Sequence, residues 1–211
     1  MKTEQLIDFL ARGAGPAPRA AAARRLGPAA LAGLIASSAL ALGLIGPVPA
    51  ALLGSSGIGV KLLYGGALAT AAAWLAARQG RPAAAATLPW RAVAGVLGGM
   101  ALWGTVSLIE LSADQRLPAL LGQSWGRCPW AVLGLSLPAL GATLWALHGL
   151  APTRPRSAGC AAGLLAGALG TIGYALACQE PSPAFVAVWY SAGIAITALL
   201  GALLGPRVLR W

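Results

Sequence analysis

A series of long apolar segments constrains the fold of this chain more than any other feature. Six windows, each about 20 residues long and with at most one charged side chain, match the length that an α-helix needs to cross a bilayer. They lie at residues 26–45, 58–77, 92–111, 129–148, 159–178 and 184–204. The chain is 58% hydrophobic and only 9% charged, which is too apolar for a water-soluble domain. We therefore predict an all-α, polytopic membrane protein with a bundle of six transmembrane helices.

The basic residues divide unevenly between the two ends of these windows. Because the number of spans is even, both termini lie on one side, and twelve of the fifteen lysines and arginines fall there. These twelve are Lys2, Arg12, Arg19, Arg24, Arg25, Arg78, Arg81, Arg91, Arg154, Arg156, Arg207 and Arg210. The positive-inside rule then predicts that both termini of this multi-pass protein are cytoplasmic.

The same asymmetry explains the net charge of +10 without a nucleic-acid partner. We expect two parts: residues 1–25 as a cytoplasmic arm, and residues 26–211 as the transmembrane domain in the lipid bilayer.

Few ionisable side chains fall inside the predicted spans. Lys61 and Glu110 both lie within about one turn of the outer interface, where they either form an ion pair or reach the interface independently. The midplane carries no charge, which argues against a proton-coupled transporter. We find no phosphate-binding glycine loop, no paired histidines and no catalytic triad, and we expect neither enzymatic activity nor a cofactor. A small-solute transporter or facilitator is the alternative to a regulatory protein.

Glycines at four-residue spacing predict close helix packing. The fifth window has Gly159, Gly163 and Gly167, and the pairs Gly95/Gly99 and Gly201/Gly205 repeat the spacing. Small residues in this pattern allow transmembrane helices to approach closely. We expect all of them to make contacts within the bundle.

Two of the three cysteines are predicted to reach the same height. Cys128 precedes the fourth window and Cys178 ends the fifth, each 25 residues from Thr153 in the short inner loop between them. Neighbouring helix axes lie about 8–10 Å apart, so a disulfide is feasible if both side chains face inward. The pair is either a structural disulfide or a sensor of oxidants or thiophilic metals, with both thiols as metal ligands in the latter case. Cys160, at the inner end of the fifth window, is expected to be a packing residue.

The N-terminal arm has the pattern of a short amphipathic helix. Thr3 can cap it, Glu4 favours its positive end, and the glycines and prolines from position 13 onward end it. Its apolar stripe consists of Leu6, Ile7, Phe9 and Leu10. A helix of about ten residues is marginal alone in water, so this one needs a membrane surface or a groove in another protein. The acids at positions 4 and 8 disfavour an anionic membrane surface.

Several motifs together resemble a known family. They are TEQLIDFLA at the start, Lys61, the Cys128–Pro129 pair, LWALHGLAPTRP at 144–155, CQEPSPAFVAVWY from Cys178, and the tail GALLGPRVLRW. They are similar to the NrsF family of bacterial inner-membrane anti-sigma factors, over nearly the whole chain.

The resemblance implies a cytoplasmic arm that binds an extracytoplasmic-function sigma factor. It also implies two periplasmic cysteines that act in sigma-factor release under metal or oxidative stress, and by motif these are Cys128 and Cys178. The expected sigma-binding residues are Leu6, Ile7, Asp8, Phe9 and Leu10. In the family a histidine often precedes the second cysteine, whereas this chain has Ala177, which favours redox chemistry over metal chelation.

Overall fold

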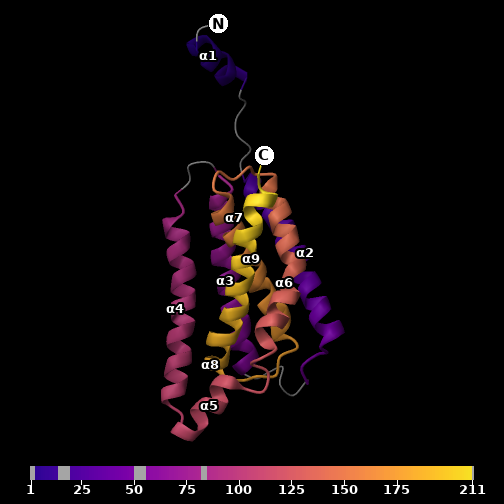
Figure 1. The fold of residues 1–211 in the computed structure, drawn as a ribbon, viewed down its shortest axis with the longest axis vertical. Coiled ribbons are helices and arrows are strands. Elements are labelled where there is room, and N and C mark those ends of the chain that lie inside the picture. The colour runs from indigo at the N-terminus through magenta and orange to yellow at the C-terminus, as the bar shows by residue number, and fades with distance from the viewer. Residues whose placement is uncertain (1–2, 14–19, 50–55, 82–84, 211) are drawn as a thin grey trace.

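The computed structural model describes residues 3–13, 20–49, 56–81 and 85–210, which form helices with no strand among them (Figure 1). In chain order the helices are α1 (Thr3–Gly13), α2 (Ala21–Leu44), α3 (Ser56–Gln79), α4 (Thr87–Ile109), α5 (Ala113–Leu121), α6 (Cys128–His148), α7 (Pro155–Ala175), α8 (Pro183–Phe185), η2 (Val186–Tyr190) and α9 (Ser191–Val208). The π-helical turn η2 joins α8 to α9, so that Pro183–Val208 is one continuous span.

Six of these helical segments are long and apolar enough to cross a membrane, as predicted. They are α2, α3, α4, α6, α7 and the α8–α9 segment. Each of the last three spans has a proline in its first turn, where the missing N–H costs nothing because it has no helical acceptor. Helix α2 begins at Ala21, so its first turns include residues 21–25, which the sequence analysis assigned to the arm.

Helix α7 is the centre of the bundle. Nearly all of it is buried, and it packs against α2, α3, α6 and α9 (Figure 1). The glycines of α7 allow these neighbouring helices to pack closely against it. A Cβ on Gly163 would lie 2.6 Å from the Cα of Ala198 in α9, and one on Gly173 would lie 2.8 Å from the backbone of Ser37 in α2. The predicted role of the fifth window in close packing is confirmed.

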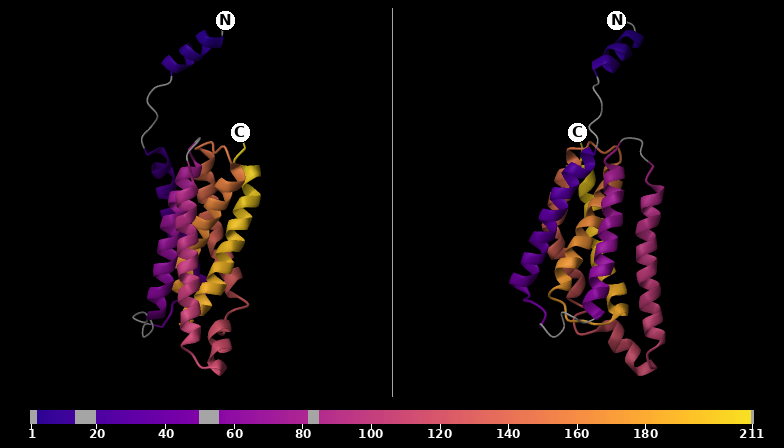
Figure 2. Two further views of the ribbon diagram at one scale, coloured as in Figure 1. Left: turned by 90° about the vertical axis from the view of Figure 1, so that its left-hand side faces the viewer. Right: turned by 180° about the vertical axis from the view of Figure 1, so that it is seen from behind.

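The glycines of the other two pairs behave differently from each other. Gly201 and Gly205 meet the backbone of α7, as predicted. A Cβ on Gly95 or Gly99 would meet nothing within 4 Å, because these residues lie on an open side of α4. The prediction that this pair makes bundle contacts is wrong. Helix α4 stands at the edge of the bundle, where it contacts α3 and the α8–η2 segment (Figure 2).

Both ends of the chain lie at the same end of the bundle, as the even number of spans requires (Figure 1). We call this the termini face and the other end the opposite face. Helix α1 lies apart from the bundle, beyond the termini face (Figure 2). The short helix α5, which the sequence analysis did not predict, lies at the opposite face. The indole N–H of Trp189 in η2 anchors it by a 2.9 Å hydrogen bond to the carbonyl of Leu120.

Candidate thiol site and arm helix

Cys128 and Cys178 lie near each other at the opposite face. Cys128 is the first residue of α6, and Cys178 follows the last turn of α7, so the α6–α7 hairpin brings both to one end of the bundle. Each thiol is within electrostatic range of the other. Both are free thiols, and both are buried, with exposed fractions of 0% for Cys128 and 4% for Cys178.

A carboxylate joins the segments that carry the two thiols. Oxygen Oε1 of Glu180 accepts hydrogen bonds from the backbone N–H of Gln123 at 2.7 Å and from the N–H and hydroxyl of Ser124, both at 3.1 Å. The carbonyl of Ser124 in turn accepts the N–H of Cys128 at 2.9 Å. We call Glu180, Gln123 and Ser124 the Glu180 clamp. It connects the residues just after Cys178 to the residues just before Cys128.

Gly122 makes room for this clamp. Its backbone has a φ of 56° and a ψ of −163°, a region that is essentially restricted to glycine. A Cβ at this position would lie 2.6 Å from the Glu180 carboxylate and 2.8 Å from the ring of Phe185. The turn that presents the clamp donors therefore depends on glycine for both its conformation and its space.

Lys61 also fixes the Cys178 segment. Its ammonium donates a 2.6 Å hydrogen bond to the carbonyl of Cys178 and also lies beside the thiol of the same residue. The side chain is only 1% exposed, which is rare for lysine. Among the charges near the ammonium is the Glu180 carboxylate.

Two tyrosines close the site toward the centre of the bundle. The rings of Tyr174 and Tyr190 pack with centroids 5.5 Å apart, and the hydroxyl of Tyr174 lies beside both thiols. The hydroxyl of Tyr190 is buried close to Cys178 and has no hydrogen-bond partner of good geometry. The thiols are therefore enclosed by aromatic groups on the membrane side.

Two pockets adjoin the segment from Cys178 to Glu180. The larger has a volume of about 550 Å³ and lies between the ends of α2 and α7 and the start of α6. The smaller, of about 100 Å³, is lined by Lys61 and by the start of α3. Cys178 lines both pockets, and Cys128 lines neither.

Lys61 and Glu110 do not form an ion pair, which was one of the two hypotheses for these residues. Glu110 is exposed at the end of α4, and no ion pair joins it to Lys61 in the described part of the chain. The lysine instead turns inward, because a backbone carbonyl and two nearby thiols offer it polar partners inside the bundle.

The described residues contain no group of three or more His, Cys, Asp or Glu side chains that could hold a metal ion. Cys128 and Cys178 alone supply two soft sulfur ligands. This set suits a thiophilic ion bound transiently, rather than the four-ligand structural sites that zinc adopts.

The arm forms the predicted helix, α1. Ile7 and Phe9 are 62% and 74% exposed, and Asp8 is also exposed. The side chains of Leu6 and Leu10, which complete the predicted stripe, lie outside the described residues. An amphipathic helix whose described apolar residues face solvent is available to a partner.

Comparison with known proteins identifies the group to which this arrangement belongs. Residues 10–211 match the model of the NrsF family, described as negative regulator of sigma F. The chain belongs to the NrsF family. It is 38% identical over 216 residues to the anti-sigma-F factor NrsF of Caulobacter vibrioides (strain NA1000 / CB15N), with 100% of both chains covered. Identity and coverage are the same for the probable anti-sigma-F factor NrsF of Azospira oryzae. No solved structure matches.

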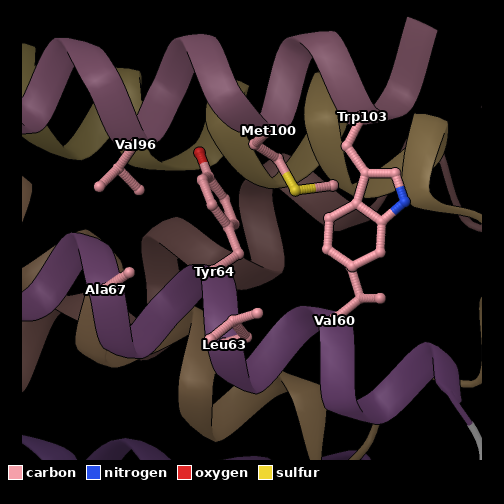
Figure 3. Close-up of a pocket in the computed structure, with 7 residues that line it drawn as sticks. All are labelled: Val60, Leu63, Tyr64, Ala67, Val96, Met100 and Trp103. Carbon is pink, nitrogen blue, oxygen red and sulfur yellow. The ribbon is translucent and has the colours of Figure 1, made fainter. Parts of the chain in front are cut away.

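Membership of the NrsF family favours a regulator over the alternative of a transporter, and a pocket within the membrane region agrees with this. The pocket has a volume of about 190 Å³ and lies between α3 and α4 (Figure 3). Its walls are formed by Val60, Leu63, Tyr64, Ala67, Val96, Met100 and Trp103. The hydroxyl of Tyr64 is engaged with Ser191 at 2.7 Å. An almost wholly apolar pocket offers a polar solute nothing to bind.

The residues of this thiol site that were missed at the level of sequence include Ser124, Tyr174 and Glu180. Glu180 follows Cys178 by two positions, and a carboxylate so close to a thiol in a short outer loop was an available signal. Ser124 and Tyr174 carried no comparable signal, because their roles depend on how the loops fold together.

Proposed function

We propose that this protein is an anti-sigma factor of the bacterial inner membrane that binds an extracytoplasmic-function sigma factor through α1 and releases it when Cys128 and Cys178 are modified. The observation that carries the proposal is the separation of two features by the bundle. An exposed amphipathic helix stands beyond the termini face, and a buried pair of free thiols lies at the opposite face. Family membership supports the sigma factor as the partner.

Charge supports an orientation with the termini face in the cytoplasm. Exposed arginines at this face include Arg81, Arg154 and Arg156, whereas Arg116 and Arg127 lie at the opposite face. Excess positive charge marks the cytoplasmic side of membrane proteins. This orientation gives α1 access to a sigma factor and exposes the thiol site to the periplasm, where oxidation of thiols is favoured.

A change at the thiols can reach the termini face through α7. To move the sigma-bound fraction from nearly all to nearly none, a signal must favour the releasing state by about 5.5 kcal/mol. Formation of a disulfide changes stability by about 2–4 kcal/mol, which is a large part of this requirement. The central position of α7 allows a tilt of α6 and α7 to shift α2, which leads directly to the arm. The inner α6–α7 loop with its exposed arginines lies at the same face.

Oxidation is the favoured modification. Two thiols with no third ligand group among the described residues give a thiophilic metal only a weak site, whereas two neighbouring thiols suffice for a disulfide. Metal stress then acts by capping or bridging the same two sulfurs.

The test measures sigma-factor release in cells that carry cysteine variants. We expect Cys128→Ser, Cys178→Ser and the double variant to keep the sigma factor bound and to lose the response to oxidants and thiophilic metals. Cys160→Ser is the matched control and should respond normally, since this cysteine lies near the other end of α7. The readouts are a sigma-dependent reporter, with and without stress, and an immunoblot of the membrane fraction.

A purely structural thiol pair gives a different result. Loss of either thiol then depletes the protein from the membrane and turns the reporter on without stress. High basal reporter activity with depleted protein contradicts sensing and leaves the thiols with a structural role.

A further inference from the structure

We propose that the two thiols have different roles: Cys178 reacts first with a hydroperoxide, assisted by the Lys61 ammonium, and Cys128 then resolves the product to a disulfide. This inference rests on the proposed function, because it specifies how the thiol site receives its signal. It treats Cys178 as the modification site and Lys61 as a positioning residue.

Access to solvent distinguishes the two sulfurs. Cys178 lines both the 550 Å³ pocket and the 100 Å³ pocket, while Cys128 lines neither and is fully buried. Each pocket has room for a molecule the size of hydrogen peroxide, since a cavity of about 10–15 Å³ already holds a water. A small polar oxidant therefore meets residue 178 before residue 128.

The electrostatic surroundings distinguish them again. The Lys61 ammonium contacts Cys178 through both its carbonyl and its thiol, and it lines the smaller pocket together with that residue. An ammonium group has three N–H donors, and the carbonyl of Cys178 accepts only one of them. The remaining N–H groups can hydrogen-bond to the sulfur beside them and to an oxidant in the smaller pocket. Because the lysine is 1% exposed, water screens this interaction little.

The chemistry balances with a hydroperoxide as the oxidant. With hydrogen peroxide, the sulfur of Cys178 attacks one peroxide oxygen, an S–O bond forms as the O–O bond breaks, and the leaving oxygen takes up the proton of the thiol to give water. Sulfur is oxidised by two electrons to a sulfenic acid, and the peroxide is reduced. Cys128 then attacks the sulfenic sulfur, an S–S bond forms, the S–O bond breaks, and a second water leaves.

Cys128 is suited to the second step. It is the first residue of α6 and is fully buried. It also lies within electrostatic range of Cys178 and beside the same tyrosine hydroxyl. It is thus a close neighbour of Cys178 with little access to solvent.

The experiment uses the full chain in membrane vesicles, in a Cys160→Ser background, with hydrogen peroxide and dimedone as a trap for sulfenic acid. We expect Cys128→Ser to give the dimedone adduct at position 178. We expect Cys178→Ser to react at position 128 on the order of tenfold more slowly, as burial of a thiol requires. In the chain with both outer thiols, a brief peroxide pulse should place the first adduct on Cys178. This measurement keeps both outer thiols and Lys61 unchanged.

Lys61 variants distinguish an electrostatic role from a structural role, because the two roles change the rate of adduct formation at position 178 in opposite directions. Loss of a structural contact loosens the Cys178 segment and speeds its reaction, whereas loss of a stabilising charge slows it. We expect Lys61→Met to slow adduct formation at position 178 on the order of tenfold, and Lys61→Arg to retain most of the rate. A faster reaction in Lys61→Met contradicts the electrostatic role.

Equal rates at the two cysteines, or a first adduct on Cys128, overturn the assignment of roles. The sigma-dependent reporter tells this failure apart from failure of the proposed function. If the thiols react at equal rates and the reporter still needs both, sensing stands and the order of reaction is wrong. If Cys178 reacts first and the sigma factor stays bound, the order stands and the proposed function is wrong.

Discussion

The ammonium of Lys61 and the carbonyl of Cys178 are 2.6 Å apart, although 117 residues separate them in the chain. This bond joins the start of α3 to the segment that follows α7, and the Glu180 carboxylate lies near the same ammonium. The Cys178 segment is therefore held at two points, by Lys61 at residue 178 and by the Glu180 clamp at residue 180.

We expect Lys61→Met to destabilise the protein. The substitution leaves the buried Cys178 carbonyl without a donor, which costs about 1–3 kcal/mol, and removal of a buried charge offsets part of this. A net loss of about 1 kcal/mol in the free energy of unfolding follows from these two effects. Thermal unfolding in detergent measures it, and Lys61→Arg is the control that retains a donor. Equal stability of the two variants contradicts a structural role for the bond.

Gly122→Ala should open the Glu180 clamp. The positive φ and the contact of the new Cβ with the Glu180 carboxylate together cost about 1–3 kcal/mol. Because Ser124 accepts the N–H of Cys128, loosening of the clamp should expose Cys128 and speed its labelling by a maleimide. Gly126→Ala is the matched control, since a Cβ there meets nothing within 4 Å. Unchanged labelling of Cys128 in Gly122→Ala would show that the clamp does not shield this thiol.

Gly163→Ala should disrupt the packing of α7 against α9. The added Cβ would lie 2.6 Å from the Cα of Ala198, and a backbone contact cannot rotate away, so we expect a loss of about 1–3 kcal/mol or more. Gly99→Ala is the control, because that side of α4 is open and alanine favours a helix by about 1 kcal/mol over glycine. Unfolding temperatures in detergent should fall for Gly163→Ala and hold or rise for Gly99→Ala. A parallel change in the two variants contradicts the packing argument.

The sequence predicted the helices of this fold much better than their contacts. Hydropathy and length determine a transmembrane helix locally, so all six spans were found. Helix α5 was missed because Asp114, Arg116 and Pro118 interrupt its apolar residues. Gly95 and Gly99 have the spacing of contact residues, but spacing does not reveal whether a neighbour lies on that side of a helix.

The thiol site was predictable in part for the same reason. Cys128 and Cys178 are equally far in sequence from the loop that joins their helices. Because a helix has a constant rise per residue, this spacing predicted that both lie at one height. The partner of Lys61 was not predictable, because it is a backbone carbonyl brought close only by the packing of α3 on α7. The Glu180 clamp likewise depends on the turn at Gly122, which no local pattern indicates.

Single cysteines introduced at exposed positions should report the orientation of the bundle. In a background without native cysteines, a membrane-impermeant maleimide added to cells with a permeabilised outer membrane should label residues 116 and 181. It should not label residues 81 and 154, because the positive-inside rule puts the termini face in the cytoplasm. All four side chains are exposed, so burial does not hide any of them. The reverse pattern would put α1 in the periplasm and rule out binding of a cytoplasmic sigma factor.

Substitution in the arm tests the sigma-binding surface directly. Phe9 is 74% exposed on α1, and a partner groove that binds the apolar stripe must desolvate whatever side chain replaces it. We expect Phe9→Asp to weaken sigma binding by at least about 2 kcal/mol, or roughly 30-fold in Kd, because a buried unpaired carboxylate is costly. The sigma-dependent reporter should switch on without stress, and the amount of protein in the membrane should not change, since α1 lies apart from the bundle (Figure 1). Phe9→Leu keeps the stripe apolar and should retain the sigma factor in a co-purification from detergent. If Phe9→Asp also retains it, the sigma factor binds the inner loops at the termini face, and α1 is a helix that lies on the membrane surface.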